Sequence, residues 1–422
     1  MKRSLAQWLD YQQQIHPKSI DMGLERVGAV ARALGLGKPA RHVITVAGTN
    51  GKGSTVAFVE AIARAAGLRV AAYTSPHLLR YNERLRIDGV DATDAAFIAA
   101  FERIDAARGP IPLTYFEFGT LAAFLICSEQ IIDVAILEVG LGGRLDATNL
   151  VDPDVAIITT VDLDHQDWLG ADREAIGAEK AGILRAGKPA VLAEPDPPSS
   201  VLRRAYALGA FAIRGQADYL VDDLGDGRWR WREPGYAIDL PAPAMAAPSQ
   251  RDNAAAAIAA LRALDLPIDD AAIVAGVAAA RAPGRLQRLG GRPETVVDVA
   301  HNPQAARQLA GWLAANPKPT VAVFSALADK DIAAIAAVLD PGLEAWHVGP
   351  IVDAGTRGLA TDELVRRLAA VVAPGRIHAH PDLATARAAA AAAIGPAGRV
   401  LVFGSFHTVA DALAADEPHA SG

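Results

Sequence analysis

The stretch His42-Val43-Ile44-Thr45-Val46-Ala47-Gly48-Thr49-Asn50-Gly51-Lys52-Gly53-Ser54 decides how the first half of the chain folds. Its apolar, β-branched start predicts a buried strand over 42–47, and the residues from about Lys52 to Ala66 predict a helix. Glycines let backbone N–H groups curve around phosphate oxygens, and the helix start and the Lys52 ammonium add attraction for negative charge. This order of strand, glycine-rich loop and helix predicts a phosphate-binding loop for ATP.

The loop departs twice from the common pattern G-x-x-x-x-G-K-[ST]. Val46 stands at the position of the first glycine, and Gly53 follows Lys52 where a Ser or Thr is usual. The hydroxyl that normally contacts magnesium must therefore come from Ser54 or from another part of the chain.

Composition limits the partners of the chain. It has 422 residues, 51% of them hydrophobic, a net charge of −7 and a single cysteine, Cys127. This length allows two buried cores, and one cysteine allows no disulfide within the chain. The acidic balance argues against nucleic acid as a partner. We find neither a secretory signal nor a credible membrane span, so we expect a cytoplasmic protein with no membrane partner.

Short apolar runs alternate with segments of helical period, which is typical of a mostly parallel sheet covered by helices. After the first strand we expect strands at Arg69–Tyr73, Asp133–Val139, Val155–Thr160 and Pro189–Ala193, a helix at Arg173–Arg185, and a β-hairpin around Gly225–Trp231.

The alternation restarts after Ala282-Pro283-Gly284-Arg285. We expect a strand at Thr295–Val299, a helix at 303–315, a strand at Thr320–Phe324 and a last strand at 399–403, with an alanine-rich helix before it. The predicted fold class is therefore α/β. It comprises an ATP-binding domain over 1–285, with a central mostly parallel sheet flanked by helices, and a smaller Rossmann-like α/β domain over 286–422.

Two predicted strand ends carry candidate metal ligands, because ATP chemistry needs magnesium and magnesium prefers oxygen ligands. Glu138 follows a buried run, and ligands of open α/β sheets bind at the carboxyl ends of strands. After the next strand, Asp164, His165 and Asp167 are equal candidates on chemistry alone.

Lys180 lies in apolar surroundings on a predicted helix. It either forms an ion pair beside Glu179 or, with its pKa lowered by desolvation, reacts with CO₂ to give a carbamate that binds the metal.

The second domain offers another group of polar residues at the end of its first strand. Asp298 is suited to accept hydrogen bonds from ribose hydroxyls, and His301 and Asn302 fit a nucleotide or amino-acid contact. Arg285 is either a solvated linker residue or a phosphate ligand that acts when the two domains close.

Taken together, these strings resemble the bacterial bifunctional dihydrofolate synthases/folylpolyglutamate synthases, a family of the Mur-ligase-like superfamily. The resemblance extends over nearly the whole chain. It rests on Ile20–Val27, the phosphate loop, Thr74–Leu78, Leu113–Glu117, Leu137–Asn149, Asp164-His165, Glu179–Gly182, Asp298–Pro303 and Gly404–Thr408.

The resemblance implies roles for individual residues. It assigns Ser75, Glu138 and His165 as magnesium ligands, so that Ser75 supplies the missing hydroxyl, and it implies that Lys180 is carbamylated and joins them. Lys52, Lys180 and His165 are the implied catalytic residues. The implied ATP contacts are Thr49, Asn50, Gly51, Lys52, Gly53, Ser54, Asn253, Arg285, Asp298 and His301. The implied pterin contacts are Ile20, Asp21, Met22, Thr114, Leu145, Asp146 and Ala147. Met22 stands where a leucine is common.

The implied reaction is ATP-dependent ligation of L-glutamate to dihydropteroate and to reduced folates through an acyl phosphate. Magnesium is the implied metal, a monovalent cation is a further candidate, and we expect a monomer. Three alternatives remain: a monofunctional folylpolyglutamate synthase, a cell-wall Mur ligase and a nucleotide-binding switch without ligase activity. The cell-wall enzyme needs a UDP-binding domain of about a hundred residues before the loop, whereas 47 residues precede Gly48 here.

Overall fold

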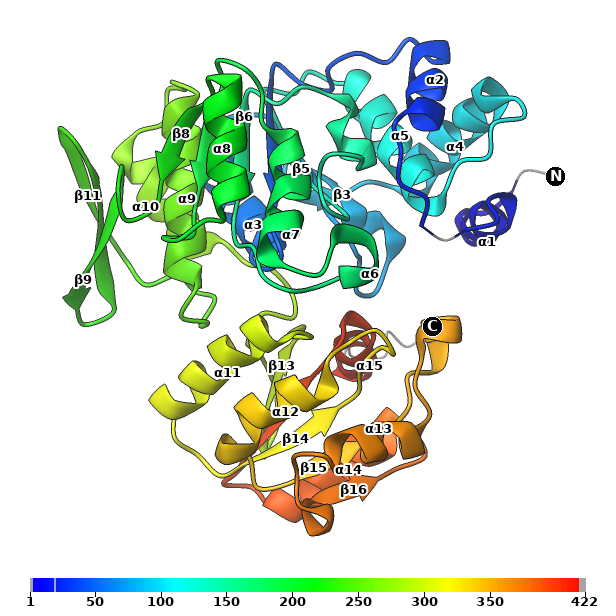
Figure 1. The fold of residues 1–422 in the computed structure, drawn as a ribbon, viewed down its shortest axis with the longest axis vertical. Coiled ribbons are helices and arrows are strands. Elements are labelled where there is room, and N and C mark those ends of the chain that lie inside the picture. The colour runs from blue at the N-terminus through cyan, green and yellow to red at the C-terminus, as the bar shows by residue number, and fades with distance from the viewer. Residues whose placement is uncertain (1–2, 19, 417–422) are drawn as a thin grey trace. The chain divides into compact units, whose positions relative to one another are not determined.

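The computed structural model describes residues 3–18 and 20–416. By its internal contacts the chain divides into two units, which are described separately below (Figure 1). The first unit comprises Met1–Ala244 and Arg251–Arg281, and the second comprises Met245–Gln250 and Ala282–Gly422. The short segment Met245–Gln250 thus belongs to the second unit although it lies within the sequence of the first.

An eight-stranded sheet forms the centre of the N-terminal unit, in the order β4-β3-β2-β5-β1-β6-β7-β8. The six strands from β2 to β8 in this order are parallel, and the β2–β3 and β3–β4 pairs are antiparallel. The strands are β1 His42–Ala47, β2 Val70–Tyr73, β3 Leu85–Ile87, β4 Val90–Asp91, β5 Val134–Glu138, β6 Val155–Ile158, β7 Pro189–Leu192 and β8 Phe211–Arg214.

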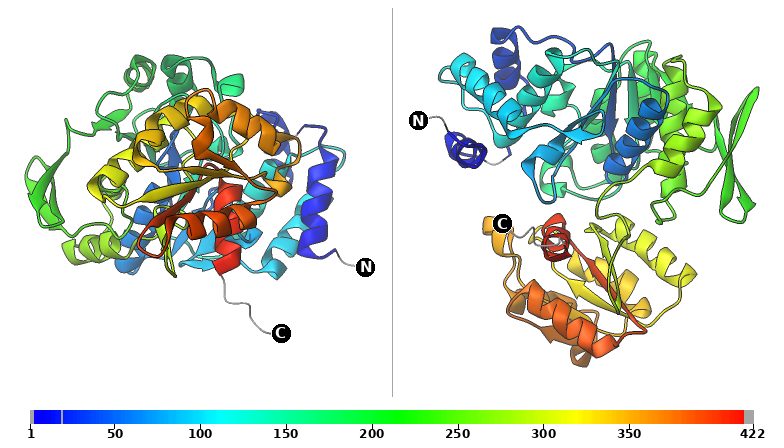
Figure 2. Two further views of the ribbon diagram at one scale, coloured as in Figure 1. Left: turned by 90° about the horizontal axis from the view of Figure 1, so that it is seen from below. Right: turned by 180° about the vertical axis from the view of Figure 1, so that it is seen from behind.

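Helices cover both faces of this sheet. Helix α3 contacts β1, β2 and β5 and packs against α10, whereas α7 and α8 pack together beside β8 (Figures 1 and 2). The helices of this unit are α1 Leu5–Ile15, α2 Glu25–Ala33, α3 Lys52–Ala65, α4 Asp94–Arg108, α5 Tyr115–Ser128, α6 Gln166–Leu169, α7 Arg173–Lys180, α8 Ser199–Leu208, α9 Gln250–Ala263 and α10 Asp270–Ala279.

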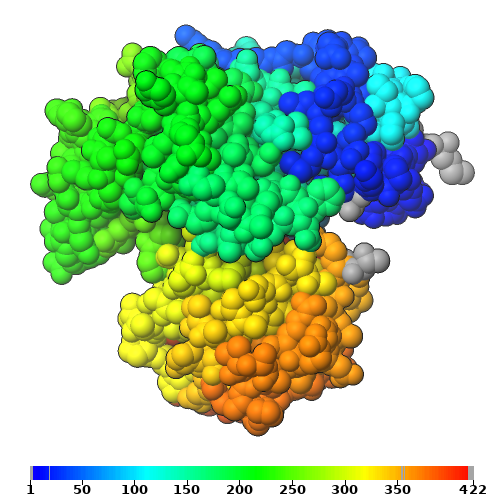
Figure 3. Space-filling model, viewed as in Figure 1, coloured from blue at the N-terminus to red at the C-terminus, as the bar shows by residue number. Residues whose placement is uncertain are grey.

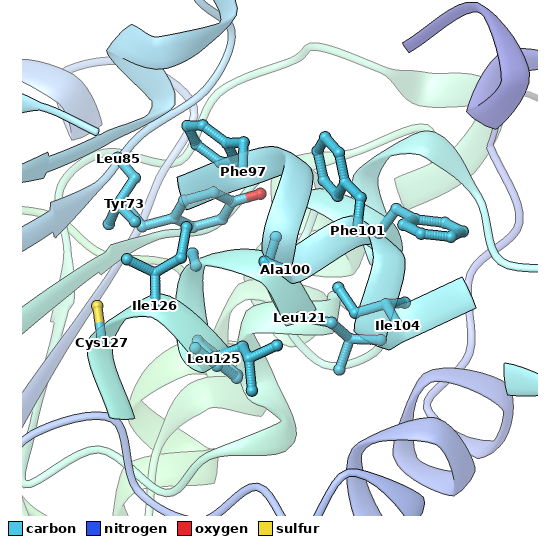
Figure 4. Packing of buried hydrophobic residues seen from close by; sticks show 14 of the residues in the cluster. Tyr73, Leu85, Phe97, Ala100, Phe101, Ile104, Leu121, Leu125, Ile126 and Cys127 are labelled. Atoms are coloured by element: carbon cyan, nitrogen blue, oxygen red, sulfur yellow. The ribbon is translucent and has the colours of Figure 1, made fainter. Parts of the chain in front are cut away.

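Aromatic and aliphatic side chains from α4 and α5 make one of the hydrophobic cores of this unit. Phe97 and Phe101 are fully buried and lie near Tyr73 of β2 and Leu121 of α5 (Figure 4). Cys127 is buried in the same cluster, as expected of a small core residue. This packing fixes α5 against the sheet and so fixes the start of α5, which carries Thr114.

A separate three-stranded antiparallel sheet, β11-β10-β9, follows β8. Its strands are β9 Leu220–Gly225, β10 Arg228–Glu233 and β11 Tyr236–Leu240. The predicted hairpin is therefore present, and a third strand extends it. Trp229 and Trp231 on β10 are fully buried, which explains two tryptophans in an otherwise polar segment.

The C-terminal unit is a second, smaller α/β body, drawn in yellow to orange in Figure 3. Its sheet has the order β12-β13-β17-β14-β15-β16, and only β12 is antiparallel to its neighbour. Its strands are β12 Gln287–Leu289, β13 Glu294–Asp298, β14 Thr320–Phe324, β15 Trp346–Val348, β16 Ile377–Ala379 and β17 Arg399–Phe403. Its helices are α11 Pro303–Ala315, α12 Ile332–Leu339, α13 Thr361–Leu368, α14 Leu383–Ile394 and α15 Phe406–Asp416.

The predicted fold class is confirmed, with small differences in the elements. The alanine-rich α14 contacts β14, β15 and β17, because small side chains allow a helix to approach a sheet closely. The helix predicted at 173–185 ends at Lys180, and a 3₁₀ turn over Ala181–Ile183 follows it. Within residues 3–18 and 20–416, no helix is long and apolar enough to cross a bilayer.

Candidate active site at the carboxyl ends of five strands

Five adjacent parallel strands of the N-terminal unit, β2-β5-β1-β6-β7, end along one edge of the sheet. A predicted site residue or a polar loop follows each of the first four: Ser75 after β2, Glu138 at the end of β5, the phosphate loop after β1, and the segment to His165 after β6. The carboxyl edge of a parallel sheet is where open α/β folds bind their ligands. The topology therefore brings together residues that are up to 117 positions apart.

The phosphate loop needs glycine at two of its positions. At Gly48 a Cβ atom would overlap the hydroxyl of Thr159. Gly51 has φ 86° and precedes α3, and a Cβ there would lie 2.6 Å from Oδ1 of Asn253. Asn253, predicted to contact ATP, therefore stands beside the loop.

Lys52 begins α3 and folds back over the phosphate loop. Its Nζ donates hydrogen bonds to the carbonyl oxygens of Gly48 at 2.9 Å and Thr49 at 3.2 Å. The ammonium thus lies against the backbone of the loop, where an incoming phosphate oxygen can replace these carbonyls as its partner. Ser54, two residues further along the helix, is buried.

The segment after β6 holds the phosphate loop in shape. Thr49 N donates to Thr160 O at 2.7 Å, and Asn50 N donates to Thr160 Oγ1 at 3.1 Å. The Thr49 hydroxyl donates to Asp162 O and accepts from Asp162 N, both at 3.0 Å. The loops after β1 and β6 are therefore fixed to each other through the side chains of Thr49 and Thr160 and through their backbones.

Ser75 and Glu138 lie together, as the implied magnesium site requires. Ser75 N donates to Glu138 Oε2 at 3.2 Å, and the Glu138 side chain is almost fully buried. Their hydroxyl and carboxylate oxygens are the hard ligands that magnesium takes. In the described part of the chain no three His, Cys, Asp or Glu side chains form a metal-binding group. The implied set includes only two such residues, because Ser75 and Lys180 are of other types.

His165 has an unusual backbone for a residue that is not glycine. Its φ of 51° and ψ of 41° are left-handed, and its N–H donates to Asp164 Oδ1 at 2.9 Å. Such a conformation costs about 1 kcal/mol or more and is often found at functional sites. The side chain is one-third exposed at the start of α6.

Lys180 is the most perturbed lysine of the site. Its side chain is buried, and this burial, together with repulsion from the nearby Lys52 ammonium, lowers its pKa to about 7. Asp164 and Glu194 partly oppose the shift. A substantial fraction of the amine is therefore neutral at neutral pH, which is the form that reacts with CO₂.

Asp146 organises the turn after β5. Its Oδ2 accepts from the amides of Gly140 at 3.0 Å and Leu141 at 2.9 Å, and its Oδ1 accepts from Thr148 N and Oγ1. Burial raises the pKa of this carboxyl. A Cβ at Gly140 would touch both Phe116 and Asp146, so the aromatic ring of α5 lies against this turn.

Two further pterin-assigned segments meet at α5 through Arg26. Arg26 pairs with Asp21 at 2.6 Å and with Glu117 at 3.1 Å. Glu117 in turn accepts from Thr114 N at 2.7 Å in a capping box. Arg26 and Glu117 thus join the segment from Ile20 to Met22 to the start of α5. Both residues appeared within the family strings, but neither was predicted as a site residue.

Leu145 and Ala147 flank Asp146, and Ala147 is buried in the core beside α5. A Cβ at Gly142 would lie 3.5 Å from the terminal methyl group of Met22. Met22 therefore lies beside the turn that carries Leu145, Asp146 and Ala147, whereas Asp21 is linked through Arg26 to the start of α5.

In the C-terminal unit, Asp298 shapes the loop after β13. Its two carboxylate oxygens accept from Leu286 N and Ala300 N, each at 2.8 Å, and burial raises its pKa. The guanidinium of Arg285 and the ring of His301 both lie near the ring of Phe406. Asp298 thus brings Arg285 and His301 together, and Phe406 is a neighbour that we did not predict as a site residue.

Comparison with known families agrees with this geometry. The Mur ligase middle domain matches residues 46–219, and the Mur ligase glutamate ligase domain matches residues 284–406. The dihydrofolate synthase/folylpolyglutamate synthase of Escherichia coli K12 is 46% identical over 421 residues, which cover 99% of this chain and 97% of that protein. The chain belongs to the dihydrofolate synthase/folylpolyglutamate synthase family of Mur ligases. It is thus an ATP-dependent ligase that adds glutamate in folate biosynthesis.

Other members of the family agree over nearly the full length. The Haemophilus influenzae dihydrofolate synthase/folylpolyglutamate synthase is 40% identical over 96% of both chains. The structure of E. coli FolC in complex with DHPP and ADP has a TM-score of 0.92 at 45% identity and covers 98% of this chain and 97% of that one. A bifunctional folylpolyglutamate synthase/dihydrofolate synthase from Yersinia pestis, complexed with AMPPNP and a Mn ion, has a TM-score of 0.90 at 46% identity, with 98% of both chains covered.

Glu194 and Arg173 form a charged pair at this edge of the sheet, and neither residue was predicted from the sequence as part of the site. Glu194 follows β7, the fifth of the adjacent strands, and pairs with Arg173 of α7 at 3.3 Å. Burial raises the pKa of Glu194 to about 7. The only signal available in the sequence was a carboxylate directly after the strand predicted at Pro189–Ala193, and Glu138 was indicated in a similar way, as a carboxylate that follows a buried apolar run.

Proposed function

We propose that this ligase acts on two acceptors, joining L-glutamate to dihydropteroate to give dihydrofolate and to tetrahydrofolate to give its polyglutamates. The main support is 46% identity, over 99% of this chain, to a dihydrofolate synthase/folylpolyglutamate synthase. The phosphate loop after β1 and the turn after β5, which carries the buried Asp146, lie on the same sheet and add to this support. The E. coli relative was solved with DHPP and ADP, and another relative with Mn, AMPPNP and L-glutamate.

The chemistry must make an unreactive carboxylate accept an amine. In the proposed reaction a carboxylate oxygen attacks the γ-phosphorus of ATP, the bond to the β–γ bridging oxygen breaks, and ADP leaves. The glutamate amine then attacks the acyl-phosphate carbonyl, loses a proton, and inorganic phosphate leaves. Catalysis of this kind is mostly positioning and charge neutralisation, which the loop amides and Lys52 provide.

We assign magnesium to Ser75, Glu138 and His165. The hard oxygens of Ser75 and Glu138 and the 3.2 Å hydrogen bond between these two residues support the assignment. When bound, the ion would neutralise charge on the phosphates. Relatives hold manganese with a nucleotide analogue, which supports a divalent ion. A monovalent cation is part of the proposal only as a secondary ion.

Lys180 completes the proposed metal site as a carbamate. The neutral amine attacks CO₂, a C–N bond forms, and one proton passes to solvent, which leaves an anionic oxygen ligand in place of an ammonium. The lowered pKa of Lys180, about 7, supports this step because most lysines are fully protonated at that pH.

The remaining proposed assignments concern the ATP and pterin contacts, the oligomeric state and the location in the cell. Thr49, Asn50, Gly51, Gly53, Ser54 and Asn253 of the N-terminal unit, and Arg285, Asp298 and His301 of the C-terminal unit, are the proposed ATP contacts. The segments at Ile20–Met22, Thr114 and Leu145–Ala147 are the proposed pterin contacts. We propose a monomer that works in the cytoplasm.

One assay tests the two-substrate proposal: glutamate-dependent phosphate release, first with dihydropteroate and then with tetrahydrofolate. We expect activity with both acceptors. Activity with tetrahydrofolate alone would indicate a monofunctional folylpolyglutamate synthase, and nucleotide hydrolysis that glutamate does not stimulate would favour a nucleotide switch.

The carbamate is tested separately with Lys180→Ala. Turnover should fall by about 10²-fold or more, because the variant loses both a ligand and an anionic charge. Wild-type enzyme depleted of CO₂ and bicarbonate should lose activity and regain it when bicarbonate is added. Unchanged turnover in a bicarbonate-free buffer would contradict the carbamate.

A further inference from the structure

Arg173 and Glu194 hold both polar atoms of a single residue, Val161. Val161 N donates to Glu194 Oε2 at 3.2 Å, and Arg173 Nε donates to Val161 O at 2.8 Å. Arg173 Nη2 also donates to Glu194 Oε1 at 3.3 Å and to Asp196 O at 3.0 Å. The two side chains and the Val161 backbone therefore close a ring of hydrogen bonds, which we call the Val161 clamp.

The clamp acts on the loop that carries His165. Val161 is buried and follows Thr160, which bonds the phosphate loop, and four residues later the chain reaches His165. Asp162, between them, is tied to the Thr49 hydroxyl through its N–H and its C=O. The loop is thus fixed at 160–162 on two sides, by the phosphate loop and by the clamp.

The left-handed backbone conformation of His165 explains why the start of this loop needs to be held. A left-handed residue returns to an ordinary conformation unless its neighbours hold it, because the strain costs about 1 kcal/mol or more. The clamp and Thr49 together hold the start of this short loop. We propose that Arg173 and Glu194 are positioning residues for ligation, which set the place of the His165 imidazole relative to the phosphate loop.

This inference rests on the proposed role of His165 as a metal ligand. Arginine suits the clamp because its planar guanidinium donates in several fixed directions at once, whereas a lysine ammonium cannot reach Val161 O, Glu194 and Asp196 O together. Arg173 is 42% exposed, so its ion pair contributes little to folding. A loss of the clamp should therefore act on metal binding more than on stability.

The test measures Mn²⁺ binding and activation in Arg173→Lys, Glu194→Gln and His165→Ala. Binding of Mn²⁺ in the presence of ADP is followed by the loss of the free-ion EPR signal, and activation by glutamate-dependent phosphate release. Residues that orient a metal ligand typically change metal affinity about 10- to 100-fold. We expect both clamp variants to need about 10-fold more Mn²⁺ for half-saturation, with kcat largely recovered at saturating Mn²⁺ and Tm close to wild type.

Arg108→Lys is the matched control. Like Arg173, Arg108 pairs with a carboxylate, that of Asp105, and donates to backbone carbonyls, those of Gly109 and Ile111. It lies at the end of α4, in a different part of the unit. Its Mn²⁺ half-saturation should equal that of the wild type. If Arg173→Lys does not fold, Glu194→Gln tests the same ring. The Glu194 carboxylate accepts from both Val161 N and Arg173 Nη2, whereas a glutamine amide has one acceptor oxygen and can keep only one of these bonds.

The outcomes separate the clamp from the metal site itself. If His165→Ala weakens Mn²⁺ binding while both clamp variants bind as the wild type does, the positioning role is wrong and the metal assignment stands. If His165→Ala binds Mn²⁺ with unchanged affinity, His165 is no ligand, and the clamp proposal is overturned with it.

Discussion

The two units use the same arrangement of strand, loop and helix, at β1–α3 and at β13–α11, but they complete it differently. Helix α11 has Asn302 at its N-cap, and the Asn302 side chain accepts from Ala305 N at 2.9 Å. Helix α3 has Gly51 at this position, in a left-handed conformation and without a side chain to cap the first turn. The first turn of α11 is thus capped from within the helix, whereas that of α3 has the form of an anion site.

The loops before these helices are also held differently. Asp298 holds the β13 loop through the amides of Leu286 and Ala300, within 12 residues of itself. The β1 loop depends on Thr160 and Asp162, more than 100 residues away. A phosphate loop must leave its own polar atoms for the ligand, and so its support comes from another strand end.

The largest effect should follow loss of the Lys52 charge. Lys52→Ala removes the ammonium over the loop and should lower kcat by about 10²–10³-fold, the usual effect of removing one charge-stabilising group. Glutamate-dependent phosphate release measures it. Lys38→Ala is the control, because Lys38 also donates to a backbone carbonyl, that of Arg41, and should leave kcat unchanged. A similar kcat for Lys52→Ala and wild type would remove the functional distinction between the two loops.

In the C-terminal unit, removal of the Asp298 carboxylate, which holds the loop after β13, should lower stability. Asp298→Ala leaves the buried amides of Leu286 and Ala300 without their acceptor, at about 1–3 kcal/mol for each unsatisfied group. We expect faster amide hydrogen exchange at these two residues and a lower thermal transition. Unchanged exchange at both amides would show that Asp298 does not hold this loop.

A smaller effect is expected from Gly51→Ala. Its left-handed backbone costs an L-residue about 1–2 kcal/mol, and the new methyl group would meet Asn253 Oδ1 at 2.6 Å. ADP should therefore bind about 10-fold more weakly by calorimetry. Gly67→Ala is matched in backbone, with φ 79° and nothing within 4 Å of a Cβ, and lies at the other end of α3. It should lose stability and keep the ADP affinity; equal ADP affinity in both variants would contradict the loop geometry.

The smallest effect should come from the cap of α11. Asn302→Ala removes the bond to Ala305 N and should cost about 1 kcal/mol of stability, as N-cap losses usually do. Denaturant unfolding of the C-terminal unit measures this loss. Asn302→Asp keeps an acceptor and should stay near wild type. If Asn302→Ala is as stable as Asn302→Asp, the cap contributes nothing.

The same distinction between local and distant support explains what the sequence could predict. The strand, the glycines, Lys52 and the helix that follows are adjacent in the sequence, so the phosphate loop and its helix were predictable. Helix α11 agreed with its predicted range of 303–315. Glu138 was predicted from a strand end, whereas Ser75 came only from the family resemblance, and the hydrogen bond between the two residues agrees with that pairing.

What the sequence could not predict depends on contacts between distant segments. Arg173 and Glu194 are ordinary charged residues whose role depends on Val161, 12 and 33 positions away. Strand β15 has three residues and no visible period, so nothing in its composition separates it from a loop. Arg26 is similar, since it meets Glu117 only after α5 has packed.

The segment Met245–Gln250 limits where this chain can be divided into fragments that keep their own core. Met245 and Gln250 are buried, and Ala247 packs on the core of the C-terminal unit, although 31 residues of the other unit follow in the sequence. A fragment starting at Ala282 would lack this piece of its own interior. Chimeras that exchange glutamate-ligase halves between relatives should therefore transplant two stretches of chain, and a single crossover near 282 should yield poorly soluble hybrids.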